Sequence, residues 1–320
     1  MDKELLNAAE IALKDCLRVQ TGEKLLIVTD TVLKEIGIAL QDAGKTLGLD
    51  PVLIEILPRE RNGEEPPELV THAMMKSDVV VAPTSKSLTH TEARRKACAG
   101  GARVATMPGI TKETMVRCLN ADYYKIAART EKRAEMLSEG EVIHVTSPSG
   151  TDITLPIKGI KAIPSTGLFH EPGKFGNLPS GEAYLMPEEG KSNGVFVVDG
   201  SMAGIGNLEG KQPIKVKVEN GMAVEISGGP EADELKAKLS AVGEMAFNIA
   251  EFGVGTNDAA KIIGNILEDE KVMGTIHIAL GNNMSMGGTV NVPIHLDGII
   301  KNPSFELDGK PIMKDGQLLI

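Results

Sequence analysis

Residues 24–56 read KLLIVTDTVLKEIGIALQDAGKTLGLDPVLIEI, and this stretch decides the fold class. Its two ends, residues 24–29 and 51–56, are short apolar runs of the kind found in strands that are buried on both faces. The segment between them, residues 32–47, has the apolar spacing of a helix. A strand, a helix and a second strand in this order predict a βαβ unit and therefore a parallel sheet covered by helices.

The same alternation continues to about residue 120, and beyond it the pattern changes. The sequence predicts further strands at 78–82 and 102–107 and helices at 4–19, 67–75, 89–97, 112–119 and 122–139. Strands and turns follow, with a hairpin over 141–157, short strands at 183–186, 194–199, 214–219, 222–227 and 275–280, one late helix at 256–270 and a last hairpin near residue 308. We therefore expect an α/β protein: a doubly wound, mainly parallel N-terminal domain over residues 1–125 and an α+β metal-binding domain over residues 126–320.

Composition and charge exclude several classes of partner. The 320 residues carry a formal net charge of −10, which repels phosphate backbones and anionic lipids, so no nucleic-acid or membrane partner is expected. No apolar run is long enough for a membrane-spanning helix, and the first residues do not have the pattern of a signal peptide, which predicts a cytoplasmic protein. The three cysteines form no CxxC pair, which argues against a disulfide framework and against a thiolate zinc site.

Two histidine motifs near the C-terminus point to a metal. In Pro293-Ile-His295-Leu-Asp297 the imidazole and the carboxylate are two residues apart, so both project from one face of an extended segment. His277 lies in an earlier apolar run and is placed to add a ligand from a neighbouring strand. Two imidazoles and a carboxylate suit zinc, cobalt or non-haem iron; the alternative is that each histidine is an ordinary hydrogen-bonded residue.

Two glutamates extend this candidate set. Glu182 follows the turn Pro179-Ser180-Gly181 at the start of a predicted strand, and Glu251 has Phe247, Ile249, Ala250 and Phe252 as apolar neighbours. Such neighbours draw Glu251 toward the interior, where an unpaired charge is costly. A solvated surface position is the ordinary alternative for any glutamate.

Taken in order, these motifs resemble the metal-ligand motifs of the M29 family of metallo-aminopeptidases, the group of aminopeptidase T, aminopeptidase S and PepS. The resemblance implies a two-domain, dimeric subunit with two zinc, cobalt or manganese ions in the C-terminal domain. It also implies Glu182, Glu251, His277, His295 and Asp297 as ligands, with Glu182 and Glu251 as the catalytic carboxylates. The expected activity is the release of N-terminal residues from small peptides by metal-activated water.

The sequence departs from the M29 pattern at three points. Val272 stands where the family has a further glutamate, five residues before the histidine at 277, and Met284 stands where it has a tyrosine. Only about eighteen positions separate the two histidines, which is short for the family. The missing glutamate bears on whether a second metal ion binds, and the missing tyrosine bears on the peptidase chemistry. The short spacing bears on the wall of the pocket.

A second family of the same fold offers an alternative function. The sequence also resembles the 2,5-dihydroxypyridine dioxygenases, which hold one ferrous ion with two histidines and an aspartate. His277, His295 and Asp297 meet that requirement without any contribution from Val272 or Met284. A hydrolase of another small substrate and a metal-binding protein without turnover are the remaining hypotheses. We take the aminopeptidase as the main prediction and the ring-cleaving dioxygenase as its alternative.

Overall fold

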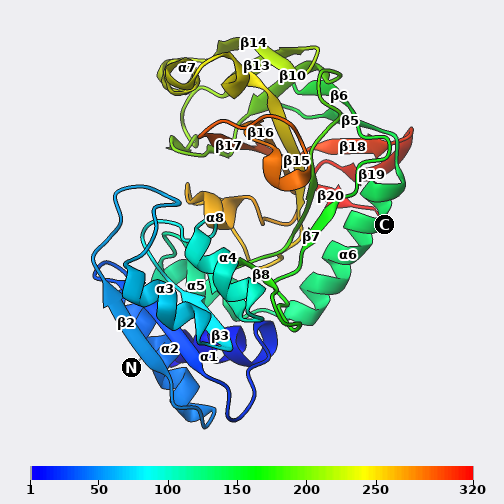
Figure 1. The fold of residues 1–320 in the computed structure, drawn as a ribbon. Helices are drawn as coiled ribbons and strands as arrows, with labels where there is room; N and C mark the ends of the chain where they lie inside the picture. Colours follow the sequence, from blue (N-terminus) through cyan, green and yellow to red (C-terminus); the bar gives the residue numbers. More distant parts are fainter. Residues whose placement is uncertain (1, 320) are drawn as a thin grey trace. The chain divides into compact units, whose positions relative to one another are not determined.

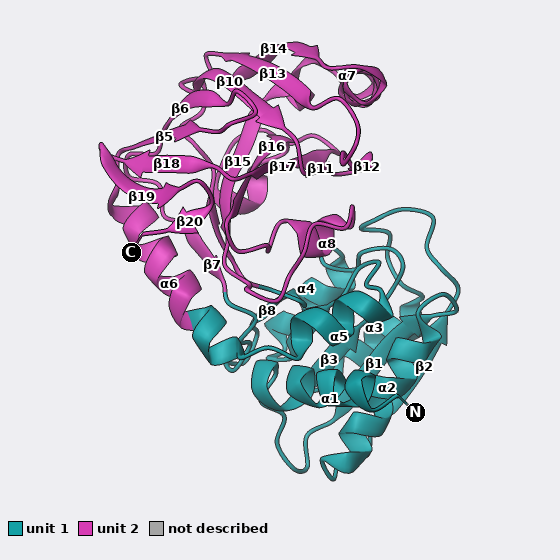
Figure 2. Cartoon of the chain, turned by 180° about the vertical axis from the view of Figure 1, so that it is seen from behind, with its two compact units in different colours: residues 1–127, 166–180 teal, residues 128–165, 181–320 magenta. Residues whose placement is uncertain are grey.

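The computed structural model describes residues 2–319, and the chain divides into two compact units (Figures 1 and 2). Unit 1 comprises Met1–Ala127 and Thr166–Ser180, and unit 2 comprises Ala128–Ser165 and Gly181–Ile320. The predicted α/β class is confirmed, since one unit holds a parallel sheet and the other holds antiparallel sheets. The sequence suggested a single boundary after residue 125, whereas a short later segment of the chain returns to unit 1.

Unit 1 is built on a five-stranded parallel sheet in the order β2-β1-β3-β4-β8. Its strands are β1 (Leu25–Asp30), β2 (Val52–Ile56), β3 (Val79–Ala82), β4 (Arg103–Thr106) and β8 (Phe175–Asn177). Its helical segments are α1 (Lys3–Ile11), the π-helical η1 (Ala12–Cys16), α2 (Lys34–Thr46), α3 (Glu68–Met75), α4 (Glu92–Ala99) and α5 (Lys112–Leu119).

The local sequence explains why these elements begin where they do. Every residue of β1 is buried, as expected for a central parallel strand. Helices α4 and α5 each begin after a threonine, because the side chains of Thr91 and Thr111 accept hydrogen bonds from backbone N–H groups of the first turn. The long helix α6 (Tyr123–Glu139) begins in unit 1 and ends in unit 2.

Unit 2 contains two antiparallel sheets, of eight strands (β14-β13-β10-β6-β5-β18-β19-β20) and seven strands (β12-β11-β17-β16-β15-β9-β7). The strands of the larger sheet are β5 (Val142–Thr146), β6 (Asp152–Pro156), β10 (Asn193–Val198), β13 (Ile214–Glu219), β14 (Met222–Ser227), β18 (Ser304–Leu307), β19 (Lys310–Lys314) and β20 (Gln317–Leu318). Those of the smaller sheet are β7 (Ile163–Ser165), β9 (Glu182–Leu185), β11 (Ser201–Met202), β12 (Gly206–Asn207), β15 (Ile249–Gly255), β16 (Thr275–Gly281) and β17 (His295–Lys301). The helical segments are α7 (Pro230–Val242), η2 (Glu244–Phe247), α8 (Ile266–Asp269) and η3 (Met284–Met286).

The seven-stranded sheet carries the candidate ligands on neighbouring strands. Strand β15 lies between β9 and β16, and β16 pairs with β17 in an antiparallel hairpin. All residues of β15 and β16 are buried, in a core shared with the larger sheet. A register shift between Ile249 and Glu251 marks a β-bulge in β15, a feature that re-aims side chains next to functional sites.

The structure corrects one expectation about unit 2 and shows elements there that were not predicted from the sequence. The predicted helix at 256–270 is wrong: only α8 is helical there, because Asn257 pairs with Val272 as an isolated bridge and Gly264 adopts a positive φ of 88°. Helix α7 follows Gly228-Gly229 and has Pro230 in its first turn, a start signal for a helix that was not predicted from the sequence. Strand β15 was also missed, since its two glycines are unusual in a strand interior.

Within residues 2–319, none of the helices combines the length and the apolar character that are needed to cross a bilayer.

Candidate metal centre

The five candidate ligands lie on four neighbouring strands of the smaller sheet in unit 2. Glu182 is on β9, Glu251 on β15, His277 on β16, and His295 and Asp297 on β17. Across β15 and β9, Glu182 pairs with Gly255, and across β16 and β17, Asp297 pairs with Ala279. The structure therefore brings together side chains that are 115 positions apart in the sequence, from residue 182 to residue 297.

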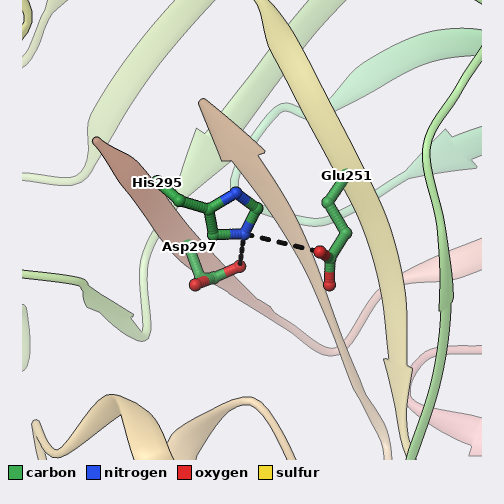
Figure 3. A group of neighbouring side chains, drawn as sticks. All are labelled: Glu251, His295 and Asp297. Atoms are coloured by element: carbon green, nitrogen blue, oxygen red, sulfur yellow. Dashed lines mark ion pairs between the residues drawn. The ribbon is translucent and has the colours of Figure 1, made fainter. Parts of the chain in front are cut away.

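Three of these side chains converge on one point (Figure 3). Nε2 of His295 lies 3.4 Å from Oδ1 of Asp297 and 3.4 Å from Oε2 of Glu251. Each of the three offers a ligand atom within 4.8 Å of the others, a spacing that one metal ion can bridge. The carboxylates of Asp297 and Glu251 are almost fully buried, at 7% and 8% exposure respectively, so each charge needs a partner.

The orientation of His295 is fixed by the backbone. Its Nδ1 lies 2.7 Å from the carbonyl oxygen of Asn282, and since a carbonyl can only accept, Nδ1 is the protonated donor. The remaining nitrogen, Nε2, faces the two carboxylates. A hydrogen bond of this kind on the far side of the ring is typical of histidines that bind metals.

His277 reaches the same cluster from β16. Its Nε2 is 3.2 Å from Oε1 of Glu251 and 3.7 Å from Oε2 of Glu182, and the side chain is completely buried. A glycine on the paired strand makes this possible, since a Cβ at Gly253 would lie 2.0 Å from His277 Nε2. The bare backbone of β15 thus leaves the space that the imidazole fills.

A lysine extends the cluster on its other side. Nζ of Lys271 lies 2.9 Å from Oε1 of Glu182 and also contacts a carboxylate oxygen of Glu270. Its side chain is only 1% exposed, which is rare for lysine and requires paired charges. The contacts form a continuous chain in which acidic and basic groups alternate: Glu270, Lys271, Glu182, His277, Glu251, His295 and Asp297.

The two histidines are more basic than usual. Burial by itself lowers the pKa of His277, but the hydrogen bond to Glu251 and the charge of Glu182 outweigh it and raise that pKa to about 9. Burial is likewise outweighed at His295, where Asp297 raises the pKa well above its ordinary value. The pKa of Asp297 falls to about 2, since His295 more than offsets the effect of burial. A divalent cation would replace the protons that these imidazoles hold.

Within this row of contacting side chains, the end formed by Glu270 and Glu182 has too little positive charge. Burial raises the pKa of Glu270 to about 8 against the opposing effect of Lys271, and burial also raises the pKa of Glu182. At Lys271 burial lowers the pKa, but Glu182 and Glu270 outweigh it, so this ammonium stays charged. Three basic side chains therefore serve four carboxyl groups, and the raised pKa of Glu270 means that this group holds a proton near neutral pH, which a further cation would replace.

Sequence reasoning missed Lys271 and Tyr184. Tyr184 is two residues after Glu182 on β9, and burial together with Glu251 raises the pKa of its hydroxyl, which keeps it protonated. The alternation of a strand would have placed Tyr184 on the face of Glu182. Val272 supplies no ligand oxygen, Met284 lies half exposed in η3, and Glu268 accepts a hydrogen bond from the backbone of Lys261.

The residues present fit a metal ion. Oε2 of Glu182 and Nδ1 of His277 are buried and have no hydrogen-bond partner, and such orphaned polar atoms beside a charged cluster are expected where a ligand binds. The donors are nitrogens and carboxylate oxygens, which suit divalent iron, zinc, cobalt or manganese. That each of the five residues is a ligand stays a prediction.

The family follows from a match along nearly the whole chain. The model of the NicX family, 2,5-dihydroxypyridine 5,6-dioxygenase, matches residues 4–320. The chain belongs to the 2,5-dihydroxypyridine 5,6-dioxygenase family. A curated relative of that name from Pseudomonas putida is 26% identical over 200 residues, which is 58% of this chain and 56% of the relative. The chain thus matches little more than half the length of that dioxygenase.

Two solved structures share the fold. A 2,5-dihydroxypyridine dioxygenase from Pseudomonas putida superposes with a TM-score of 0.83 at 20% identity, covering 98% of this chain and 96% of that one. Wild-type AmpT from Thermus thermophilus, an M29 aminopeptidase, superposes with a TM-score of 0.74 at 17% identity, covering 99% of both chains. At these identities the likeness shows the shared fold alone.

The main functional prediction is therefore wrong. The family assignment contradicts a hydrolase, an aminopeptidase and a metalloprotease, and supports the dioxygenase that the sequence offered as an alternative. The physical reason lies in the positions where the M29 pattern fails. Val272 removes one carboxylate of the expected two-metal set, and Met284 removes the expected tyrosine hydroxyl. The prediction of a divalent metal ion is retained, because Glu251, His295 and Asp297 form a triad that could hold one.

Proposed function

We propose that this protein is a mononuclear iron dioxygenase that opens the ring of 2,5-dihydroxypyridine or a closely related hydroxypyridine. The observation that carries the proposal is the family match over residues 4–320. The donor set supports it, because imidazole and carboxylate ligands with open positions are typical of non-haem iron oxygenases.

His295, Asp297 and Glu251 would hold the ion, with His277 beside them as a further nitrogen donor. When bound, ferrous iron brings dioxygen and the substrate together, and a dioxygenase delivers both oxygen atoms to the product without an external reductant. The carbonyl of Asn282 keeps Nε2 of His295 aimed at the ion. The burial of Asp297 and Glu251 strengthens their interaction with it.

The remaining polar groups are suited to binding and orienting a hydroxypyridine. Oε2 of Glu182 is free to accept a proton or a hydrogen bond from a ring hydroxyl, and burial raises the pKa of this carboxyl, which makes it a better base. Its other oxygen is held by Lys271 at 2.9 Å, so the carboxylate is fixed in place. Tyr184 adds a protonated hydroxyl on the same face of β9.

The test is oxygen consumption by protein loaded anaerobically with ferrous iron. We expect one dioxygen to be consumed for each 2,5-dihydroxypyridine lost, with disappearance of the aromatic absorbance. A 2,3-dihydroxypyridine serves as the substrate control, because its hydroxyls are placed differently on the ring. Iron bound at about one ion per chain without any oxygen consumption would overturn the proposal.

A further inference from the structure

The alternating chain of charges contains two positions for a cation between carboxylates. One is the point between Glu251, His295 and Asp297, where the proposed ion binds. The other lies between Glu182 and Glu270, and the ammonium of Lys271 already fills it. Glu182 lies between the two positions, since Oε1 contacts Lys271 and Oε2 faces His277 at 3.7 Å.

The backbone is shaped to deliver Lys271 to this place. A Cβ on Gly255 would lie 2.1 Å from the carbonyl oxygen of Val272 and 2.8 Å from the carbonyl carbon of Lys271. Glycine at this position of β15 therefore allows the segment that carries the lysine to pack directly against the strand. The N–H of Lys271 donates to the carbonyl of Glu268, which continues the turn after α8.

The carboxylates of Glu182 and Glu270 both contact Lys271, and His277 also lies 3.7 Å from the second oxygen of Glu182. Neither forms an ion pair with an arginine or with a lysine other than Lys271 among the described residues. A pair of buried carboxylates without a cation is unfavourable, and oxygen donors of this kind attract hard and borderline divalent ions. Lys271 supplies one positive charge where such an ion would supply two.

We propose that the ammonium of Lys271 takes the place of a second divalent ion and so limits the centre to a single metal. The inference rests on the metal centre of the proposed function. It also accounts for Val272: a side chain without ligand atoms is tolerated there because its neighbour already neutralises the two carboxylates. Lys271 is thus a positioning residue that sets the number of ions, and it does not touch the metal itself.

The first test is a titration of the wild-type protein with cobalt(II), followed by elemental analysis after dialysis. We expect one ion per chain even with cobalt in excess, and two tightly bound ions per chain would overturn the inference. This measurement needs no variant, so it stands even if a substitution at residue 271 prevents folding.

The second test removes the charge of the lysine. In Lys271→Gln we expect a second cobalt ion per chain and a larger rise of melting temperature with cobalt than in wild type. Lys271→Arg keeps the charge and should bind one ion. Lys191→Gln removes an exposed lysine that pairs with Glu188, and it should also bind one ion. A folded Lys271→Gln protein that still binds one ion contradicts the inference.

A double variant locates the additional ion. Glu270→Gln in the Lys271→Gln background should return the count to one ion per chain, because the second position then loses a carboxylate. If the count stays at two, the added ion lies elsewhere and the inference fails. None of these readouts uses hydroxypyridine turnover, so the proposed function and this inference can fail separately: one ion without oxygenase activity contradicts only the former.

Discussion

Both units bury charged side chains, but among the described residues the buried side-chain atoms without a hydrogen-bond partner all lie in unit 2, on Arg133, Glu182, Ser192 and His277. In unit 1, Arg103 is 8% exposed; its Nε donates to the carbonyl of Leu17 at 3.0 Å, and both terminal nitrogens bind Glu23 at 3.0 and 2.6 Å. In unit 2, Glu182 and His277 each keep one buried polar atom without a partner. A satisfied charge stabilises the fold, whereas an unsatisfied one beside a charged cluster is kept for a ligand.

The largest expected effect is the loss of the metal. In His295→Ala we expect the iron content to fall below roughly a tenth of an ion per chain and oxygen consumption to drop at least about 100-fold. Residues that only support a metal ligand already change metal affinity or activity by about 10–100-fold, so the loss of a ligand should cost at least as much. Elemental analysis and an oxygen electrode measure both. His144→Ala is the matched control, because His144 also pairs with an aspartate, Asp152, at 2.9 Å but is exposed. Equal losses in the two variants would refute the site.

The pH dependence of the metal-free protein is the next effect. The folded pKa of His277, about 9, exceeds its ordinary value of 6.5, so its contribution to stability is complete below pH 6.5 and is lost as the pH rises through 9. The free energy of unfolding should therefore fall by up to about 3 kcal/mol across this window. Urea unfolding with a chelator measures it, and His277→Gln should flatten the curve. An unchanged slope in that variant would show that other groups are responsible.

Arg103→Ala should lower stability without affecting the metal. Removing the guanidinium leaves Glu23 and the carbonyl of Leu17 without their partner, and we expect a loss of about 2 kcal/mol in the free energy of unfolding. Urea unfolding gives the stability, and elemental analysis of the same sample should give the wild-type metal content. A reduced metal content would show that the Arg103 ion pair in unit 1 is not independent of the metal centre in unit 2.

The smallest effect is expected at a helix cap. The side chain of Thr111 accepts a hydrogen bond from the N–H of Thr114 at 3.1 Å at the start of α5. Thr111→Ala should reduce the free energy of unfolding by about 1 kcal/mol, and Thr111→Ser, which keeps the hydroxyl, should restore most of it. A loss as large as that of Arg103→Ala would indicate a role beyond capping.

Much of unit 1 could be predicted because its signals are local. Continuous apolar runs and capping threonines define its strands and helices, and α5 was predicted with the observed bounds. Unit 2 was harder. The glycines of β15 weaken its strand pattern, yet they are needed because the side chain of His277 and the backbone at Val272 pack against them. The feature that hid the strand is the one that builds the site.

Part of the candidate site could be predicted, because some of its signals are also local. The spacing of His295 and Asp297 is visible in one strand, and both are indeed side by side. Lys271 was missed because a lysine after a run of acidic residues reads as a solvated helix end, and its burial is decided by tertiary contacts from β9. The motifs shared with the M29 family favour a peptidase, whereas Val272 and Met284, which break the M29 pattern, agree with the dioxygenase family.

The hairpin of β16 and β17 would give the proposed metal ion a part in folding. His277 pairs with Ile299, and His295 pairs with Gly281, so the donors of both strands are aligned only in this register. A slip of one residue would turn His295 and Asp297 to the opposite face of the sheet. If the proposed ion takes donors from both strands, it would bind the aligned hairpin and no slipped one, and would select the correct pairing as the chain folds.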